Sequence, residues 1–155
     1  MTDEAKKDFT MRISQANKSG LVVILYEMYL IYLEDAVKAE GNREEFREAV
    51  RKGRGCINEL MNSLNYDYEV AHNLLRLYIY VDREMAGADI RHSVEPLSHC
   101  RKVMTELMEA YRTVSREDIS GPVMGNTQTV YAGLTYGKGK LTESLSHYGS
   151  RGFLA

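Results

Sequence analysis

The amino-acid sequence predicts an all-α protein: an antiparallel up-down bundle of four helices, with a short N-terminal cap segment and a C-terminal tail. Apolar residues recur at helical spacing from about residue 17 to 114. The two prolines, Pro96 and Pro122, both come late, so no proline interrupts a helix before residue 95. The connections between the periodic stretches are short, and short connections make neighbouring helices antiparallel.

The first predicted helix covers about residues 19–39, with Asn17 or Ser19 as its N-cap and Gly41 at its end. Its apolar residues fall on one face and on an adjoining flank: Leu21, Leu25, Met28, Tyr29, Tyr32 and Ala36, then Val22, Tyr26, Leu30, Leu33 and Val37. A helix that is apolar on so much of its circumference is covered on several sides. We therefore expect it to be the central helix.

The second helix is predicted to begin at Asn42, because Glu45 three residues later completes a capping-box pattern. One apolar stripe follows along it: Phe46, Val50, Ile57, Leu60, Met61 and Leu64. This stripe is expected to face the core.

The opposite stripe of the second helix carries Arg43, Arg47 and Arg51 between glutamates. We interpret this stripe as a solvated face, and a basic docking patch is the alternative. Gly53 and Gly55 lie inside the same helix, where each costs about 1 kcal/mol relative to alanine. They indicate a kink or the close approach of another helix.

The third helix is expected to begin after Asn65 or Asp67 and to end near Gly87. Its predicted core face consists of Val70, Leu74, Leu77, Tyr78, Val81 and Met85. Three large apolar residues fall roughly on the back: Tyr68, Leu75 and Ile79. Such a back face needs a cover, which is a terminus, a partner or a second copy of the chain.

The fourth helix is predicted to start at Ser93, with Pro96 in its first turn. The residues expected to face inward are Leu97, Cys100, Met104, Leu107, Met108 and Tyr111, with Val103 and Val114 on the flank. After residue 114 the composition shifts to Gly, Ser, Thr and Tyr. We therefore predict a bundle domain over 1–114 and a Gly/Tyr-rich extension over 115–155.

Composition excludes several classes of protein. The net charge of −2 gives no support for nucleic-acid binding. No apolar run approaches the roughly 18 residues of a membrane span, and the first residues lack the apolar core of a signal peptide. A cytoplasmic protein is expected, and Cys56 and Cys100 are interpreted as free thiols that act as small core residues.

An enzymatic site is not expected. A carboxylate-bridged metal bundle needs carboxylates on all four helices and two Glu-x-x-His pairs, and the sequence has one such pair, Glu69 and His72. His92 and His99 near Cys100 do not have the spacing of a zinc site. No phosphate-binding loop or nucleophile motif is present. We predict no catalytic residue, no metal and no cofactor, and keep the metal bundle as the enzymatic alternative.

Three motifs occur in a characteristic order. Residues 73–80 read Asn-Leu-Leu-Arg-Leu-Tyr-Ile-Tyr, residues 21–27 read Leu-Val-Val-Ile-Leu-Tyr-Glu, and residues 57–64 read Ile-Asn-Glu-Leu-Met-Asn-Ser-Leu. These stretches are similar to Asn-Leu-x-x-Leu-Tyr-x-Tyr, Leu-Ile-x-x-Leu-Tyr-Asp and Ile-x-Glu-Leu-x-x-x-Leu of the flagellar export chaperone family FliS. The chain resembles this family over about residues 9–114.

The resemblance implies a cytosolic type III export chaperone. Such a protein binds the disordered C-terminal region of flagellin, prevents its premature polymerisation and aids its export for flagellum assembly. The export apparatus and other flagellar regulators are further expected partners. The alternative is a generic helical-bundle adaptor or a homodimerisation module acting through the same surfaces.

Candidate client contacts follow from the apolar residues that the bundle leaves uncovered. They are Tyr68, Leu75 and Ile79 on the back of the third helix, Val103 on the fourth, and Phe9 and Ile13, because an N-terminal segment can cap or gate a groove. Ordinary packing is the alternative for each. Tyr26, Asn73, Tyr78 and Tyr80 carry the resemblance and are expected to serve mainly the core.

Two interpretations of the extension stay open. It is either a disordered tail or an internal substitute for the client that occupies the groove of its own or a neighbouring chain. The apolar and aromatic content of the extension motivates the second interpretation. The groove-occupying candidates are Tyr131, Leu134, Tyr136, Leu141, Leu145 and Tyr148.

Overall fold

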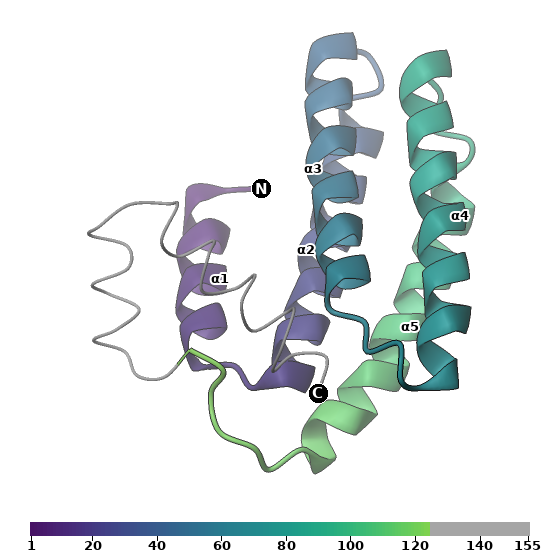
Figure 1. Cartoon of the computed structure of the whole chain (residues 1–155). Coiled ribbons are helices and arrows are strands. Elements are labelled where there is room, and N and C mark those ends of the chain that lie inside the picture. The colour runs from purple at the N-terminus through teal and green to yellow at the C-terminus, as the bar shows by residue number, and fades with distance from the viewer. Residues whose placement is uncertain (125–155) are drawn as a thin grey trace.

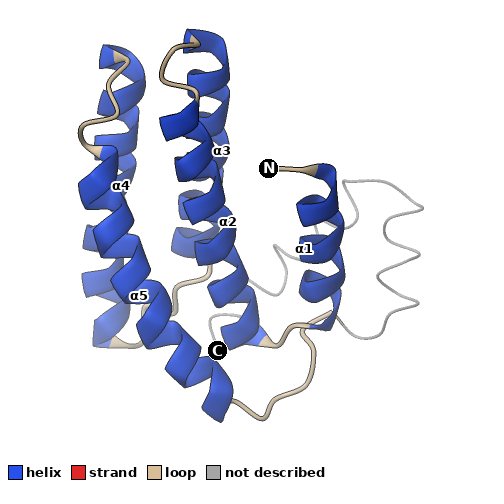
Figure 2. Cartoon of the chain, turned by 180° about the vertical axis from the view of Figure 1, so that it is seen from behind, coloured by secondary structure: helices blue, strands red, loops and turns tan. Residues whose placement is uncertain are grey.

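The computed structural model describes residues 1–124. Within this range the regular structure is entirely helical, so the predicted all-α class is confirmed. The helices are α1 Asp3–Gln15, α2 Lys18–Lys38, α3 Arg43–Asn62, α4 Glu69–Arg91 and α5 Leu97–Glu117. Helices α2 to α5 pack together, and α1 stands to one side beside α2 (Figures 1 and 2).

Helix α2 occupies the centre, as predicted, because it contacts α1, α3 and α5. Its N-cap is Asn17, whose Oδ1 accepts the backbone N–H of Gly20 at 2.9 Å. The fully buried Tyr26, Tyr29 and Leu33 face the main core, the large apolar cluster to which α2, α3, α4 and α5 all contribute. There the hydroxyls of Tyr26 and Tyr78 are 2.5 Å apart, so each of these polar tips is partnered inside the core.

Helix α3 follows the sequence pattern closely. Asn42 is its N-cap and accepts the N–H of Glu45 at 3.2 Å. Gly53 marks a close helix approach, since a Cβ there would lie 3.0 Å from Cε of Met85 in α4. Gly55 has no such neighbour within 4 Å, so only one of the two glycines is explained by packing.

Helix α4 continues past Gly87 and ends at Arg91, so the predicted end was wrong. The helix stops at His92, which adopts a left-handed conformation with φ of 49°. The His92 Nε2 lies 2.7 Å from the carbonyl of Glu40, and its ring meets Phe46 edge-on at 4.9 Å. The end of α4 is thus fixed by the α2–α3 connection, which helical periodicity does not reveal.

The core face of α4 is also narrower than predicted. Leu74, Tyr78, Val81 and Met85 are buried, together with Ala71 and Ala88. Val70 and Leu77, which were assigned to the core, are 60% and 38% exposed. They lie toward α5, which packs more extensively on α2 than on α4 and leaves this edge uncovered.

Helix α5 begins at Leu97 with Pro96 as its N-cap, so the predicted start at Ser93 was early. The Ser93 hydroxyl instead accepts the N–H of Glu95 in a turn before the helix. The predicted inward residues Leu97, Cys100, Met104 and Met108 are buried, and Leu107 and Tyr111 pack partly buried against the core. The helix runs to Glu117, beyond the domain boundary expected at 114.

The N-terminal cap segment is itself a helix, which the apolar pattern did not indicate. Helix α1 buries only one residue, Phe9, so it lacks the repeated stripe that marks an amphipathic helix. Its start is nevertheless encoded locally. The Thr2 hydroxyl accepts the N–H of Ala5 at 3.2 Å, and Asp3 and Glu4 complement the helix dipole in the first turn.

Candidate functional site

Helix α2 buries apolar side chains on a second side as well. Six buried apolar residues do not belong to the main core: Phe9 in α1, Leu21, Val23 and Ile24 in α2, and Val123 and Met124. We call these residues the outer layer. Its cover comes from the two ends of the described chain, whereas the main core is closed by α3, α4 and α5.

Helix α1 is held on α2 by a small number of contacts. Phe9 provides the buried apolar anchor. One turn later, Arg12 Nη2 lies 2.5 Å from Oε2 of Glu27, and the guanidinium sits 5.2 Å from the centre of the Phe9 ring. At the other end of α1, the amino group of Met1 pairs with the carboxylate of Asp35. One aromatic side chain and two ion pairs therefore fasten this helix.

A short segment after α5, residues 118–124, fastens the other part of the cover; we call it the strap. The Ser19 hydroxyl donates to Oδ2 of Asp118 at 2.7 Å, and the Asn17 amide donates to the Asp118 carbonyl at 3.2 Å. The N–H of Val123 donates to the carbonyl of Ala16 at 3.0 Å. The strap is thus bound to the junction between α1 and α2.

The carboxylate of Asp118 is strongly stabilised in its charged form. The Ser120 hydroxyl and backbone N–H donate to Oδ1 of Asp118 at 2.6 and 2.9 Å. Together with the bond from Ser19, they lower the pKa of the Asp118 carboxyl to about 2. At neutral pH the strap therefore keeps its anchor fully ionised.

The second apolar surface lies on the first half of α4 and on the connection just before it, where six large residues are exposed: Tyr66, Tyr68, Val70, Leu77, Ile79 and Tyr80. The side of α4 that faces α3 is identified by Asp82, which accepts two hydrogen bonds from Arg54 at 2.8 and 3.1 Å. Leu75 precedes Asp82 by seven residues and Ile79 precedes it by three, so both share this side. Tyr68 lies on the same row, just before the helix begins.

The side of α4 that faces α5 carries a different set of residues. The Tyr80 ring meets that of His99 at 5.7 Å, and Val103 follows His99 by one turn of α5. Val70 and Leu77 extend this edge along α4. Apolar side chains thus remain accessible on both edges of α4.

The predicted client contacts therefore form three groups. Tyr68, Leu75 and Ile79 lie on the α3-facing edge of α4, where Tyr68 is 60% and Ile79 37% exposed and Leu75 is half-buried. Val103 is half-buried on α5, next to the other edge.

Phe9 and Ile13 form the third group, on α1, where Phe9 is buried and Ile13 is half-buried. Sequence reasoning missed the part of the outer layer formed by Val23 and Ile24. The feature of the sequence that could have identified these two residues is the apolar character of α2 around most of its circumference. The tail candidates, Tyr131 to Tyr148, lie outside the described residues.

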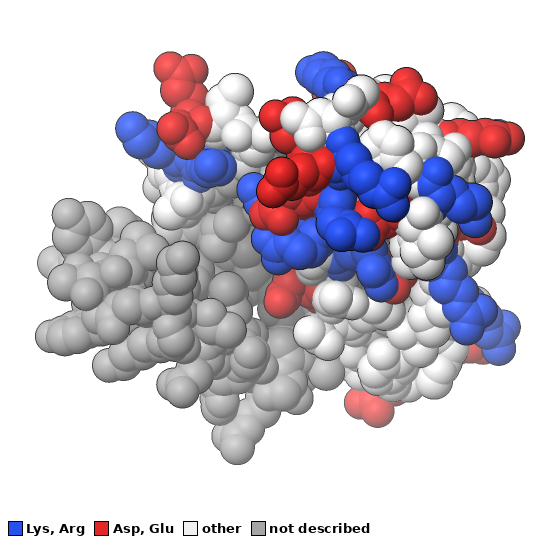
Figure 3. All heavy atoms as spheres, turned by 90° about the horizontal axis from the view of Figure 1, so that it is seen from above, with Lys and Arg blue, Asp and Glu red and all other residues white. Residues whose placement is uncertain are grey.

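Two of the three arginines on the arginine stripe of α3 make contacts within the chain. Arg51 forms two hydrogen bonds with Glu48, at 2.7 and 2.8 Å, and Arg47 reaches Asp89 of α4 at 3.4 Å. Seen from above, Lys and Arg side chains gather beside Asp and Glu side chains rather than alone (Figure 3). This arrangement supports the interpretation as a solvated face.

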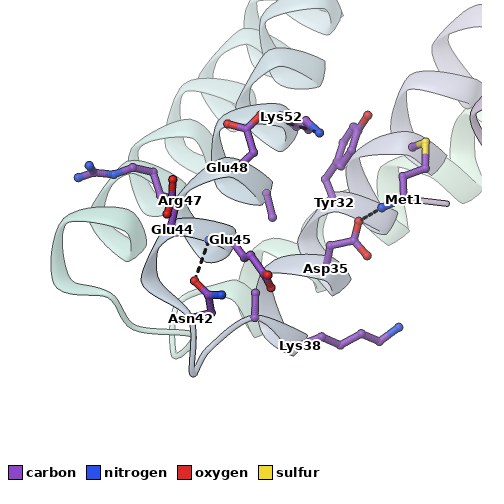
Figure 4. Close-up of a pocket in the computed structure, with 12 residues that line it drawn as sticks. Met1, Tyr32, Asp35, Lys38, Asn42, Glu44, Glu45, Arg47, Glu48 and Lys52 are labelled. Atoms are coloured by element: carbon purple, nitrogen blue, oxygen red, sulfur yellow. Dashed lines mark hydrogen bonds and ion pairs between the residues drawn. The ribbon is translucent and has the colours of Figure 1, made fainter. Parts of the chain in front are cut away.

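One pocket of about 890 Å³ lies between α2 and α3 (Figure 4). Both acidic and basic side chains line it, including Asp35, Glu48 and Lys52, and the Lys52 ammonium lies 5.9 Å from the centre of the Tyr32 ring. No group of three or more potential metal ligands occurs in residues 1–124, and Glu69 and His72 are both exposed. We therefore place the candidate site on the apolar surfaces of α4 and on the outer layer.

Comparison with protein families identifies a relationship. The sequence model of the family described as "Flagellar protein FliS" matches residues 1–118, a range that spans all five described helices. No curated protein matches the chain. Among residues 1–124, no helix is long and apolar enough to cross a membrane.

Proposed function

The chain belongs to the FliS family of flagellar export chaperones, and we propose that it binds the disordered C-terminal region of flagellin in the cytoplasm. Binding prevents premature polymerisation of flagellin and aids its export for flagellum assembly. The family match over residues 1–118 carries this proposal. Chaperones of this family are binding proteins rather than enzymes, so we assign no catalytic residue and no cofactor.

The client is proposed to contact several separate anchors. Each well-buried apolar anchor stabilises a complex by about 1.5–3 kcal/mol, whereas ordering a disordered segment costs about 2–5 kcal/mol. One anchor is therefore insufficient. The α3-facing edge of α4 offers Tyr68, Leu75 and Ile79, and the opposite edge offers Val103 together with Val70 and Leu77.

Helix α1 is proposed to act as an exchangeable cover in this complex. Phe9 and Ile13 lie on α1, whose only buried residue is Phe9. A client helix that takes the place of α1 would pack on Val23 and Ile24 of α2. Amphipathic helices are recognised in apolar grooves of this kind.

Helices α2 to α5 are proposed to form an antiparallel up-down bundle that supports these surfaces. The short connections and the contacts of α2 with α3 and α5, and of α4 with α3 and α5, support this arrangement. The chaperone domain predicted over 1–114 then extends through α5 and the strap.

The extension after the strap is proposed to substitute for client on these apolar surfaces, in its own or a neighbouring chain. Unchanged client affinity after deletion of residues 125–155 would refute that role.

Calorimetric titration with the C-terminal segment of the flagellin from the same organism tests the proposal. We expect near one-to-one binding with a submicromolar Kd and a negative heat-capacity change. Ile79→Asp should weaken binding about tenfold or more, because it places a charge on an apolar contact. Ile90→Asp is the matched control on α4, about 16 Å further along the helix, and should leave the affinity unchanged.

Three results would count against the proposal. Equal effects of Ile79→Asp and Ile90→Asp would remove the α4 edge from the site. The absence of binding by the unaltered chain would refute the flagellin assignment. If the unaltered chain forms a stable homodimer and the Ile79→Asp variant is monomeric, the result would favour the alternative, a homodimerisation module that uses the exposed residues of α4.

A further inference from the structure

Glu27 lies at a point where three helices meet. It belongs to α2, and its side chain is only 20% exposed. Arg12 of α1 approaches one carboxylate oxygen at 2.5 Å, and Arg112 of α5 approaches the other at 3.4 Å. The outer-layer residues Val23 and Ile24 precede it by one turn. Glu27 is therefore a carboxylate set in an apolar surface and covered by α1.

The two arginines differ in which carboxylate they approach more closely. Arg112 is nearer to Glu109 of its own helix, at 2.8 Å, than to Glu27, whereas Arg12 is nearer to Glu27 than to Asp8 of its own helix, which lies at 3.6 Å. Arg12 makes the shorter contact and comes from the weakly fastened α1. Departure of α1 leaves Glu27 held in place by Arg112 but without its stronger partner. A partly buried carboxylate in this position favours a replacement cation, since an uncompensated charge in apolar surroundings is costly.

We propose that Glu27 determines which segment can take the place of α1: an amphipathic helix with an Arg or Lys about three residues after a large apolar residue. The chain's own Phe9 and Arg12 provide the template for this pattern. The proposal rests on the proposed function, because the flagellin segment is the occupant it describes. Glu27 thereby adds charge selectivity to an otherwise apolar contact.

The first test separates the role of Glu27 from that of α1. Arg12→Gln loosens α1 and leaves Glu27 intact, so it should tighten binding of the flagellin C-terminal segment. Glu27→Gln loosens α1 equally but removes the proposed contact, so it should bind the segment about tenfold more weakly than Arg12→Gln does. Replacing each Arg and Lys of the flagellin segment by Gln should identify one cation whose loss has no further effect in the Glu27→Gln variant.

Equal changes in affinity for Arg12→Gln and Glu27→Gln would overturn the proposal, because Glu27 would then serve only to hold α1. Thermal unfolding of both variants checks that the fold is kept. Failure of flagellin to bind the unaltered chain would refute the proposed function. The proposed selectivity of Glu27 for a helix with a cation would then be decided by a second test.

The second test uses the chain's own helix as the probe. A synthetic peptide of residues 1–16 is added to the full-length Phe9→Ala variant, in which α1 is loosened. The peptide should bind at least about tenfold more tightly than its Arg12→Gln version, and Glu27→Gln in the protein should abolish this difference. Equal binding of both peptides would contradict the proposal irrespective of the flagellin result.

Discussion

The main core and the outer layer lie on two sides of the same helix, α2, but they are closed in different ways. The main core is covered by three long helices and includes fully buried residues such as Tyr26, Tyr29 and Leu33. The outer layer is covered by α1 and the strap, which contribute Phe9, Val123 and Met124. The difference supports the proposal that α2 combines permanent packing on one side with an exchangeable cover on the other.

The largest expected effect concerns the main core. Leu33→Ala should lower the free energy of unfolding by about 2–5 kcal/mol, because it removes a fully buried side chain and leaves a cavity. Denaturant titration measures this change. The matched control Val114→Ala, at an exposed position of α5, should stay within about 0.5 kcal/mol. Similar losses in both variants would contradict the distinction between core and surface.

The buried thiols provide a second way to separate the two regions. Burial raises the pKa of Cys56 to about 12 and that of Cys100 to about 11, so both thiols stay protonated and unreactive at pH 8. Their labelling should require opening of the main core. Leu33→Ala should accelerate labelling more than about tenfold, whereas Phe9→Ala should leave the rate unchanged. Faster labelling in Phe9→Ala would show that the two regions open together.

The outer layer should respond to the loss of its aromatic anchor on α1. Phe9→Ala should increase hydrogen exchange throughout α1, because this helix has no other buried residue. The global free energy of unfolding should fall less than it does for Leu33→Ala. Met11→Ala is the control, since Met11 is exposed on the same helix. A global loss equal to that of Leu33→Ala would mean that α1 is an integral part of the main core.

The smallest expected effect involves the strap. Because the folded pKa of Asp118 is about 2, below the unfolded value of about 4, its stabilising contribution is complete above pH 4. That contribution is lost as the pH falls from about 4 toward 2. Exchange of the Val123 amide should therefore rise over this range more steeply in the unaltered chain than in Asp118→Asn. Parallel pH profiles would exclude Asp118 as the anchor.

Much of the fold was predictable from local signals. Asn17 and Asn42 cap their helices as expected, because short polar side chains bond to the free N–H groups of a first turn. Helix α1 was missed, since Phe9 alone gives no periodic stripe. The exposure of Val70 and Leu77 depends on how closely α5 approaches α4, and periodicity within one helix does not contain that distance.

The candidate site was predictable only in part. The sequence indicated that α2 needs covering on several sides, but it did not identify α1 and the strap as the cover. It also placed Tyr68, Leu75 and Ile79 away from the core without separating them from Val103, which lies beside the other edge of α4. Which helix covers a surface, and beside which edge of α4 a residue lies, depend on how different helices pack. The spacing of residues within one helix contains no information about that packing.

Hydrogen exchange of the full-length chain with and without the flagellin C-terminal segment shows directly whether the client replaces α1. Amides of α1, residues 3–15, should lose protection on binding, whereas those of α2 around Val23 and Ile24 should remain protected by the client. The α4 edge that contains Ile79 should gain protection. Tight flagellin binding that leaves α1 equally or more protected would rule out an exchangeable α1, because the cover of the outer layer would then be permanent.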